Sequence, residues 1–217
     1  MTFPLMPAVP PPVKTTTPSL TLIGTTQTTG DGFPSGTLPV TSGTKIVVVA
    51  LDQAGSLASA VTLDGVSMIL AASRDVNLKT AAVWYLETSS SGNLAISGTG
   101  GGGGGRSVLY GFEMRNYTSV TPIFTSDAGS TDGSTLAFSA NTPYRGTFFG
   151  AGMADPGTVT MTADRGETPT LSNTNLESAS SHFTYRQVGT EVGPTTYTLT
   201  YPAGATQDAA VAYAVWI

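Results

Sequence analysis

Hydrophobic and polar residues alternate along most of the chain, in short runs that are separated by Gly, Pro, Asp and Ser. Alternation with a period of two predicts β-strands, and about a dozen such runs without a helical period predict an all-β protein. In the run Ser59–Ala71, the pair Asp64-Gly65 is typical of a two-residue hairpin turn. The apolar residues that this turn places on one face are Val61, Leu63, Val66 and Met68. Because an apolar face of this width must be covered by a second layer, the hairpin predicts an antiparallel β-sandwich.

Two further runs are apolar on both faces, which is typical of central strands. They are Thr44–Leu51 (TKIVVVAL) and Asp208–Trp216 (DAAVAYAVW). A third run, Thr80–Leu86, places Trp84 and Tyr85 on opposite faces of one strand, so one of the two rings is predicted to lie in the core.

The remaining predicted strands are Leu20–Thr26, Asn93–Ser97, Ser107–Met114, Ser134–Ser139, Gly146–Met153, Thr158–Thr162, Ser181–Val188 and Thr195–Tyr201. In TVTMT and TYTLTY the threonines share one face, which predicts one solvated face for each of these strands. The run Gly100–Gly105 is predicted to be a flexible loop, because a phosphate-binding loop would lead into a helix and here a strand follows. The segment Asn116–Gly133 has little periodicity and is predicted to be a crossing segment.

Residues 1–18 differ from the rest of the chain because six of them are prolines. Proline lacks the ladder donor and favours extended backbone, so we predict a Pro-rich arm over residues 1–18 and one β-sandwich domain over residues 19–217. The apolar residues predicted to anchor the arm on a neighbouring surface are Phe3, Leu5, Met6, Val9 and Val13. A disordered tail is the alternative interpretation. The arm does not show the pattern of a secretory signal, so we expect synthesis and folding in a cytoplasm.

Charge and composition narrow the possible partners. Charged residues make up 11% of the chain and the net charge is −5, which disfavours nucleic acid because binding to phosphates depends on Lys and Arg. No run of 18 apolar residues is present, so no membrane insertion is predicted. The chain has no Cys, which excludes disulfides and thiolate zinc sites.

The search for catalytic chemistry gives no site. The single histidine, His182, is predicted to be a solvated strand residue, and Asp127 and Asp132 lack the spacing of a calcium loop. The carboxylates in or beside predicted turns are Asp155, Asp164, Glu167, Glu177 and Glu191. We interpret them as turn-capping residues, with a glycosidase built on two of them as the alternative. We therefore predict a protein that is not an enzyme and has no catalytic residue, cofactor or metal site.

Most aromatic residues lie on predicted core faces. Tyr117 and Tyr144 are the two predicted to be exposed, and they are the candidate contacts for a glycan.

The order of several segments resembles a known group of proteins. These segments are KIVVVAL, VTLDGVSMILAAS, AAVWYL, LAISGTG, SVLYGFEM, GAGM, ESASSHFTYRQV, YTLTY and AAVAYAVWI. Over roughly residues 40 to 217 the chain is similar to jelly-roll virion structural proteins of tailed bacteriophages and gene transfer agents. The glycine run departs from that pattern. The resemblance implies a jelly-roll sandwich that an N-terminal arm attaches to the particle as a decoration, spike or fibre head, without catalytic residues.

We therefore expect a non-enzymatic structural protein in the virion, attached to a capsid, portal or tail component and present as a homo-oligomer on the particle. A carbohydrate-binding module or adhesin that contacts a host-surface glycan is the alternative. The sequence leaves open whether the location is the capsid or the tail, and how many copies assemble.

Overall fold

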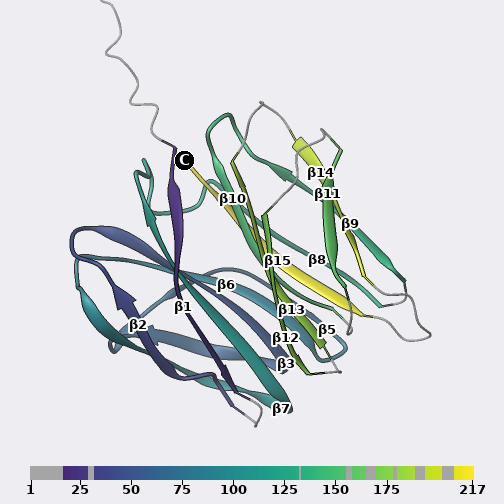
Figure 1. Ribbon diagram of the computed structural model, residues 1–217, viewed down its shortest axis with the longest axis horizontal. Helices are drawn as coiled ribbons and strands as arrows, with labels where there is room; N and C mark the ends of the chain where they lie inside the picture. The colour runs from purple at the N-terminus through teal and green to yellow at the C-terminus, as the bar shows by residue number, and fades with distance from the viewer. Residues whose placement is uncertain are drawn as a thin grey trace, which may run out of the picture.

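The computed structural model describes residues 17–28, 32–131, 133–154, 158–164, 170–177, 180–188, 194–201 and 208–217. All regular elements in this part are β-strands, and they pair antiparallel (Figure 1). No helix that could cross a bilayer occurs among the described residues. The predicted arm residues Phe3, Leu5, Met6, Val9 and Val13 lie outside the described part.

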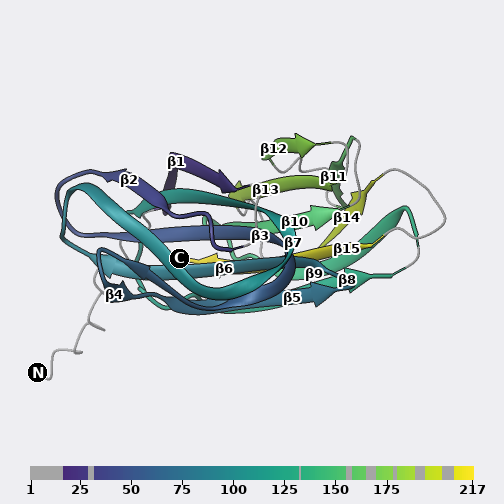
Figure 2. The same cartoon turned by 90° about the horizontal axis from the view of Figure 1, so that it is seen from below.

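The first half of the chain forms a seven-stranded sheet. Its strands are β1 (Ser19–Thr28), β2 (Gly36–Val40), β3 (Lys45–Leu63), β4 (Val66–Ser67), β5 (Ile69–Val76), β6 (Lys79–Thr88) and β7 (Gly92–Arg115). The order along the sheet is β1-β7-β3-β6-β5, while β2 also pairs with β7 and β4 with β3. The two longest strands, β3 and β7, run side by side as curved ribbons (Figure 2).

This sheet folds over onto itself. Residues 46–53 of β3 pair with residues 107–114 of β7, and after a shift in register residues 55–63 of β3 pair with residues 96–103 of β7. One apolar cluster contains Val47 and Val49 from the first stretch together with Val61 and Leu63 from the second, so the two stretches face each other. We call the folded-over part (β2, β4, the second stretch of β3 and the paired part of β7) the first layer, and the rest of the sheet the second layer.

The second half of the chain supplies two further layers. The third layer is a five-stranded sheet in the order β12-β13-β10-β15-β8. Its strands are β8 (Phe124–Ser130), β10 (Thr147–Ala154), β12 (Thr170–Glu177), β13 (Ser180–Val188) and β15 (Ala209–Trp216). The fourth layer is a three-stranded sheet in the order β11-β14-β9. Its strands are β9 (Thr135–Asn141), β11 (Thr160–Ala163) and β14 (Pro194–Thr200). Figure 1 shows this sheet on the side of the molecule opposite β2.

Three apolar cores lie between the four layers. Alternate residues of β3 enter different cores: Val47 and Val49 face the first layer, while Val48 faces the third layer. Alternate residues of β15 likewise enter the second and third cores, with Trp216 in one and Tyr213 in the other. Because apolar residues fill both faces of these strands, they must lie at the centre of a stack rather than on its surface.

Most of the strand pattern is confirmed. Asp64-Gly65 forms the hairpin turn, with positive φ angles of 50° and 78°, and pairs Leu63 with Val66. The predicted central runs lie in the first part of β3 and in β15, and their apolar residues are buried. Trp84 and Tyr85 are both buried and enter different cores. The Thr-rich runs of β11 and β14 have one buried and one solvated face.

The prediction for the glycine run is wrong. Gly100–Gly105 is not a loop between strands but part of β7, and Gly100, Gly102 and Gly103 pair with β3. The run lies where β3 and β7 fold over, and Gly100 has a φ of +72°. Glycine permits this backbone conformation, while the ladder of backbone hydrogen bonds continues without side chains.

Three further details differ from the predictions. Val66 pairs with Leu63 across the turn, as predicted, but it is 55% exposed rather than buried with Leu63, because it belongs to the two-residue strand β4 at the edge of the first layer. The segment Asn116–Gly133 contains β8, which pairs with β15. Strands β2 and β12 were not predicted, because Gly36–Val40 contains a proline and Thr170–Glu177 lacks an alternating apolar face.

Candidate functional site

One end of the stack gathers polar groups from many segments. Strands β1, β3 and β10 begin there, since Ser19 pairs with Arg115 at the end of β7, Lys45 with Thr88 at the end of β6, and Thr147 with Trp216 at the end of β15. We call this the arm-proximal end, because β1 begins there and residues 1–18 precede β1 in the sequence.

Both ends of the described chain are fastened at the arm-proximal end. The buried Thr147 hydroxyl donates to the carbonyl of Pro18 at 2.9 Å, which holds the residue just before β1. The backbone N–H and the hydroxyl of Thr118 both donate to the carbonyl of Ile217, at 2.6 and 2.9 Å. Figure 1 accordingly shows the C-terminus beside the start of β1.

Lys45 lies at the start of β3 and is completely buried. Its ammonium group donates to three backbone carbonyls, those of Thr41, Gly43 and Ser90. An ammonium has three N–H donors, so these bonds use its full capacity. Burial lowers the pKa of Lys45, while the nearby Glu113 carboxylate acts in the opposite direction. The lysine therefore joins the β2–β3 loop to the β6–β7 loop.

Glu113 and Arg115 hold the other side of the same loop. The buried Glu113 carboxylate accepts hydrogen bonds from the backbone N–H and the hydroxyl of Thr41. The Arg115 guanidinium donates to the Thr41 hydroxyl at 2.6 Å and to the Ser42 carbonyl at 2.7 Å. It also lies 3.6 Å from the Glu113 carboxylate. These bonds fix the β2–β3 loop from both sides.

Tyr117 is half-buried rather than exposed, so this part of the sequence prediction is wrong. Its ring packs against the core between the second and third layers, because the segment after β7 crosses that end of the stack. Its hydroxyl donates to Glu87 at 2.7 Å. Burial, together with this hydrogen bond to a carboxylate, raises the pKa of Tyr117 to about 12. The phenol therefore stays protonated, and its polar end is committed to Glu87.

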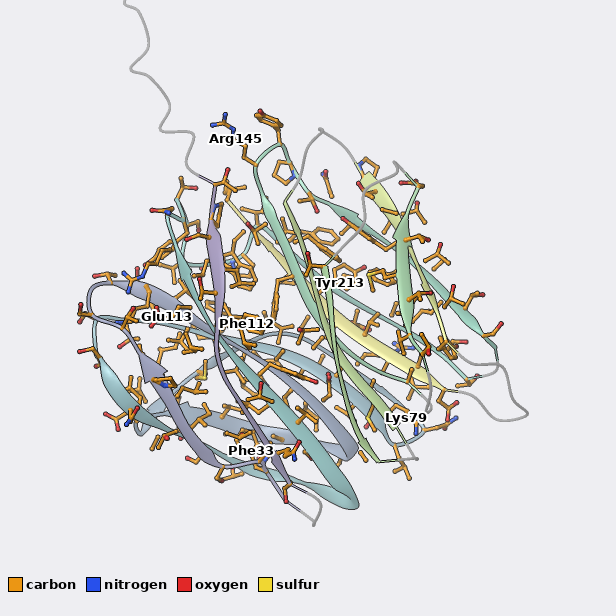
Figure 3. The ribbon with its side chains drawn as sticks, in the orientation of Figure 1. Phe33, Lys79, Phe112, Glu113, Arg145 and Tyr213 are labelled. Atoms are coloured by element: carbon orange, nitrogen blue, oxygen red, sulfur yellow. The ribbon has the colours of Figure 1, made fainter. Side chains whose placement is uncertain are left out.

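Tyr144 is exposed as predicted, with 57% of its surface accessible. The neighbouring Arg145 guanidinium lies over the ring, 5.2 Å from its centre, and Figure 3 shows Arg145 projecting from the arm-proximal end. Arg145 has a positive φ of 64°, which turns the chain just before β10. An aromatic ring next to a guanidinium can stack on a flat or apolar partner surface.

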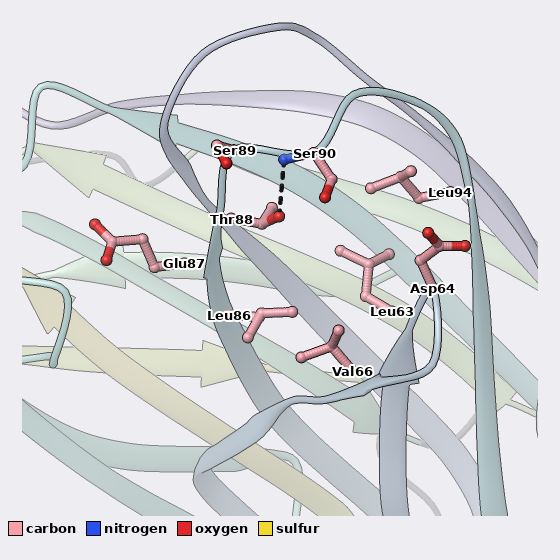
Figure 4. A pocket seen from close by; sticks show the side chains of 9 residues that line it. All are labelled: Leu63, Asp64, Val66, Leu86, Glu87, Thr88, Ser89, Ser90 and Leu94. Atoms are coloured by element: carbon pink, nitrogen blue, oxygen red, sulfur yellow. Dashed lines mark hydrogen bonds between the residues drawn. The ribbon is translucent and has the colours of Figure 1, made fainter.

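A pocket of about 280 Å³ opens at the same end, between the first layer and the end of β6 (Figure 4). Its apolar walls are Leu63, Val66, Leu86 and Leu94. Asp64, Glu87 and the hydroxyl residues Thr88, Ser89 and Ser90 complete the lining, and the carboxylate of Glu87 points away from the pocket (Figure 4). Because the Ser90 carbonyl is held by Lys45, the loop that forms one wall is tied to the interior.

The other candidate residues are spread over the molecule. Asp164 accepts a hydrogen bond from the backbone N–H of Thr196, which agrees with a turn-capping role. Asp127 lies 3.3 Å from Arg74, which joins the edge strands β8 and β5. His182 and Glu177 lie on β13 and β12. Asp132, Asp155, Glu167 and Glu191 lie outside the described residues. Among the described residues no group of three possible metal ligands comes together.

Sequence reasoning missed the polar cluster around Lys45. The signal was present, because Lys45 and Glu113 stand in runs whose other residues are almost all apolar. A charged residue in a covered strand must find partners, so each is expected to take part in a buried polar contact.

Comparison of the chain with protein-family models, with curated proteins and with solved structures gives no match.

Proposed function

We propose that this protein is a non-enzymatic structural protein of a tailed-phage particle, attached through its N-terminal arm and displaying the β-sandwich. The proposal includes the finer assignment of the sandwich as a jelly roll with a Pro-rich arm. It also includes a location in the virion, on a capsid, portal or tail component, in several copies.

The observation that carries the proposal is that the segment leading to the arm is fastened at one end of the molecule. The Thr147–Pro18 hydrogen bond fastens the start of β1 at the arm-proximal end, so an attached arm would leave the opposite end of the stack facing outward. Bonds around Lys45 and Glu113 brace the loops at the same end. A display module needs such a connection, because force on the arm would otherwise peel the first strand away.

Cosedimentation with purified particles that lack this protein tests the proposal. We compare the intact chain with a full-length variant, Phe3→Ser with Leu5→Ser and Met6→Ser, which removes apolar arm residues without shortening the chain. The matched control is Leu78→Ser, because Leu78 is 61% exposed and lies in the β5–β6 turn. We expect the control to sediment with particles and the arm variant to stay in the supernatant. Failure of the intact chain to bind any particle contradicts the proposal.

The second candidate function is a carbohydrate-binding module or adhesin, and the exposed Tyr144 favours it. A ring that is 57% exposed and flanked by Arg145 offers a stacking surface, whereas Tyr117 is committed to Glu87. Glycan-array binding that is lost in Tyr144→Ala and kept in Leu78→Ala would support this function. Absence of binding by the intact chain would count against it.

A further inference from the structure

The pocket at the arm-proximal end combines an apolar interior with an acidic rim. Leu63 and Leu94 are buried at its base, while Val66 is 55% exposed at its edge. The exposed carboxylate of Asp64 lies at the rim, whereas the Glu87 carboxylate points away from the pocket and accepts from Tyr117 (Figure 4). A ligand that fits this pocket must carry apolar side chains, which would pack against the apolar walls, and a positive charge, which would pair with the carboxylate at the rim.

The chain contains a segment of this chemistry shortly before β1 in the sequence. Residues 1–30 include one lysine, Lys14, and no acidic residue. Within them, Val9–Lys14 reads VPPPVK, with a valine at each end of three prolines and the lysine directly after. Consecutive prolines favour the extended polyproline conformation, so little conformational entropy is lost when such a segment binds.

The distance from the start of β1 to the pocket suits this segment. At the arm-proximal end the strands β1, β7, β3 and β6 are adjacent, so three inter-strand steps of about 4.8 Å separate β1 from β6, or about 14 Å. A polyproline segment advances about 3.1 Å per residue, so about five residues cover this distance. Counting back from Thr17, an extended chain directed along the sheet would reach the pocket near Val13.

We propose that residues Val9–Lys14 dock in the pocket of their own chain, with the valines and prolines against Leu63, Val66, Leu86 and Leu94 and with Lys14 near Asp64. Docking within one chain is favoured over docking between copies, because a short connection gives the segment a millimolar effective concentration. The proposal does not rest on the proposed function. If both hold, docking leaves Phe3, Leu5 and Met6 as the part of the arm that contacts the particle.

Paramagnetic relaxation in the full-length protein tests the docking. Because the chain has no cysteine, the single substitution Ala8→Cys accepts one nitroxide label beside the segment. We expect strong broadening of the amide signals of Leu63, Val66 and Ser90, and none around Leu78 in the β5–β6 turn. A mixture of labelled, isotope-free chains with unlabelled, isotope-enriched chains should show no broadening.

Three variants examine the chemistry. Val66→Lys removes an apolar wall and repels Lys14, so the ratio of docked to free arm should fall about tenfold. Asp64→Asn keeps the turn while removing the charge at the rim, and should lower the ratio about two- to fivefold. Leu78→Lys is the matched control and should leave the broadening unchanged.

Three results would overturn the proposal. The first is equal broadening at the pocket and around Leu78 in the intact chain. The second is broadening at the pocket that survives Val66→Lys. The third is broadening in the mixed sample, which would place the arm of a second copy in the pocket. The dispersion of the amide spectrum verifies that each variant is folded, and particle binding is a separate readout, so failure here leaves the proposed function unaffected.

Discussion

Replacing Lys45 with Met should destabilise the fold strongly, although the side chain keeps nearly the same volume. The substitution removes an ammonium whose three donors bind the carbonyls of Thr41, Gly43 and Ser90. The methionine cannot donate, so three backbone acceptors at the junction of two loops lose their partner. Lys45 itself is completely buried, whereas Thr41, Gly43 and Ser90 are exposed loop residues, so water replaces part of the lost bonding.

The expected loss follows from two opposing contributions. A hydrogen bond to a charged group contributes about 1.5–3 kcal/mol, so three of them contribute about 5–9 kcal/mol. Removing the buried charge also removes its desolvation penalty of several kcal/mol, which stabilises the variant. The net loss in the free energy of unfolding is therefore about 2–4 kcal/mol, which lowers the melting temperature by about 4–16 °C in a domain of this size.

Urea unfolding at pH 7, followed by circular dichroism and by tryptophan fluorescence, measures this loss. The matched control is Lys79→Met at the start of β6, where the side chain is only partly buried, and a change below about 1 kcal/mol is expected. If Lys45→Met were no more destabilising than Lys79→Met, the three carbonyls would not depend on the ammonium, and the reasoning would be refuted.

Three further predictions concern other parts of the structure. The pKa of Tyr117 is about 12, above that of a tyrosine in the unfolded chain, so the protonated phenol stabilises the fold fully below pH 10 and this contribution is lost as the pH rises toward 12. In Tyr117→Phe, the decrease in the free energy of unfolding between pH 10 and pH 12 should be smaller by about 1–2 kcal/mol. In Gly98→Ala the new methyl group would overlap the Phe33 ring, costing about 1–3 kcal/mol by urea unfolding, and adding Phe33→Ala should recover part of the loss. Deleting Ala209–Ile217 removes a wall shared by two cores, and no cooperative thermal transition should remain.

The position of a strand in the stack could be predicted where its own sequence shows which of its faces are buried. IVVVAL in β3 and AAVAYAVW in β15 are apolar at every position, and such strands have no face left for water. The structure places each between two cores. The threonines of β11 and β14 indicated the outer layer in the same way, because they occupy one face only.

The fold-over of the first sheet could not be predicted from alternation. Residues on both stretches of β3 alternate with the same period, and periodicity does not tell whether two stretches continue one plane or turn to face each other. That information lies in contacts distant in sequence, such as the Leu38 side chain of β2, which packs over Gly111 of β7. A side chain at position 111 would fill the space that Leu38 occupies, so the glycine permits the two layers to approach.

The candidate site was harder to predict than the fold, because its groups are polar residues from loops that the sequence separates widely. Thr41 and Glu113 are 72 residues apart, yet two hydrogen bonds join them. The burial of Lys45 explains why these loops lie together. Because β3 begins in the interior, the ammonium of Lys45 needs acceptors there, and the loops supply backbone carbonyls that no strand pairing uses. The same requirement fixes one wall of the pocket, because the Ser90 carbonyl is bound to Lys45. One buried cation thus links the stability of the fold to the shape of the pocket.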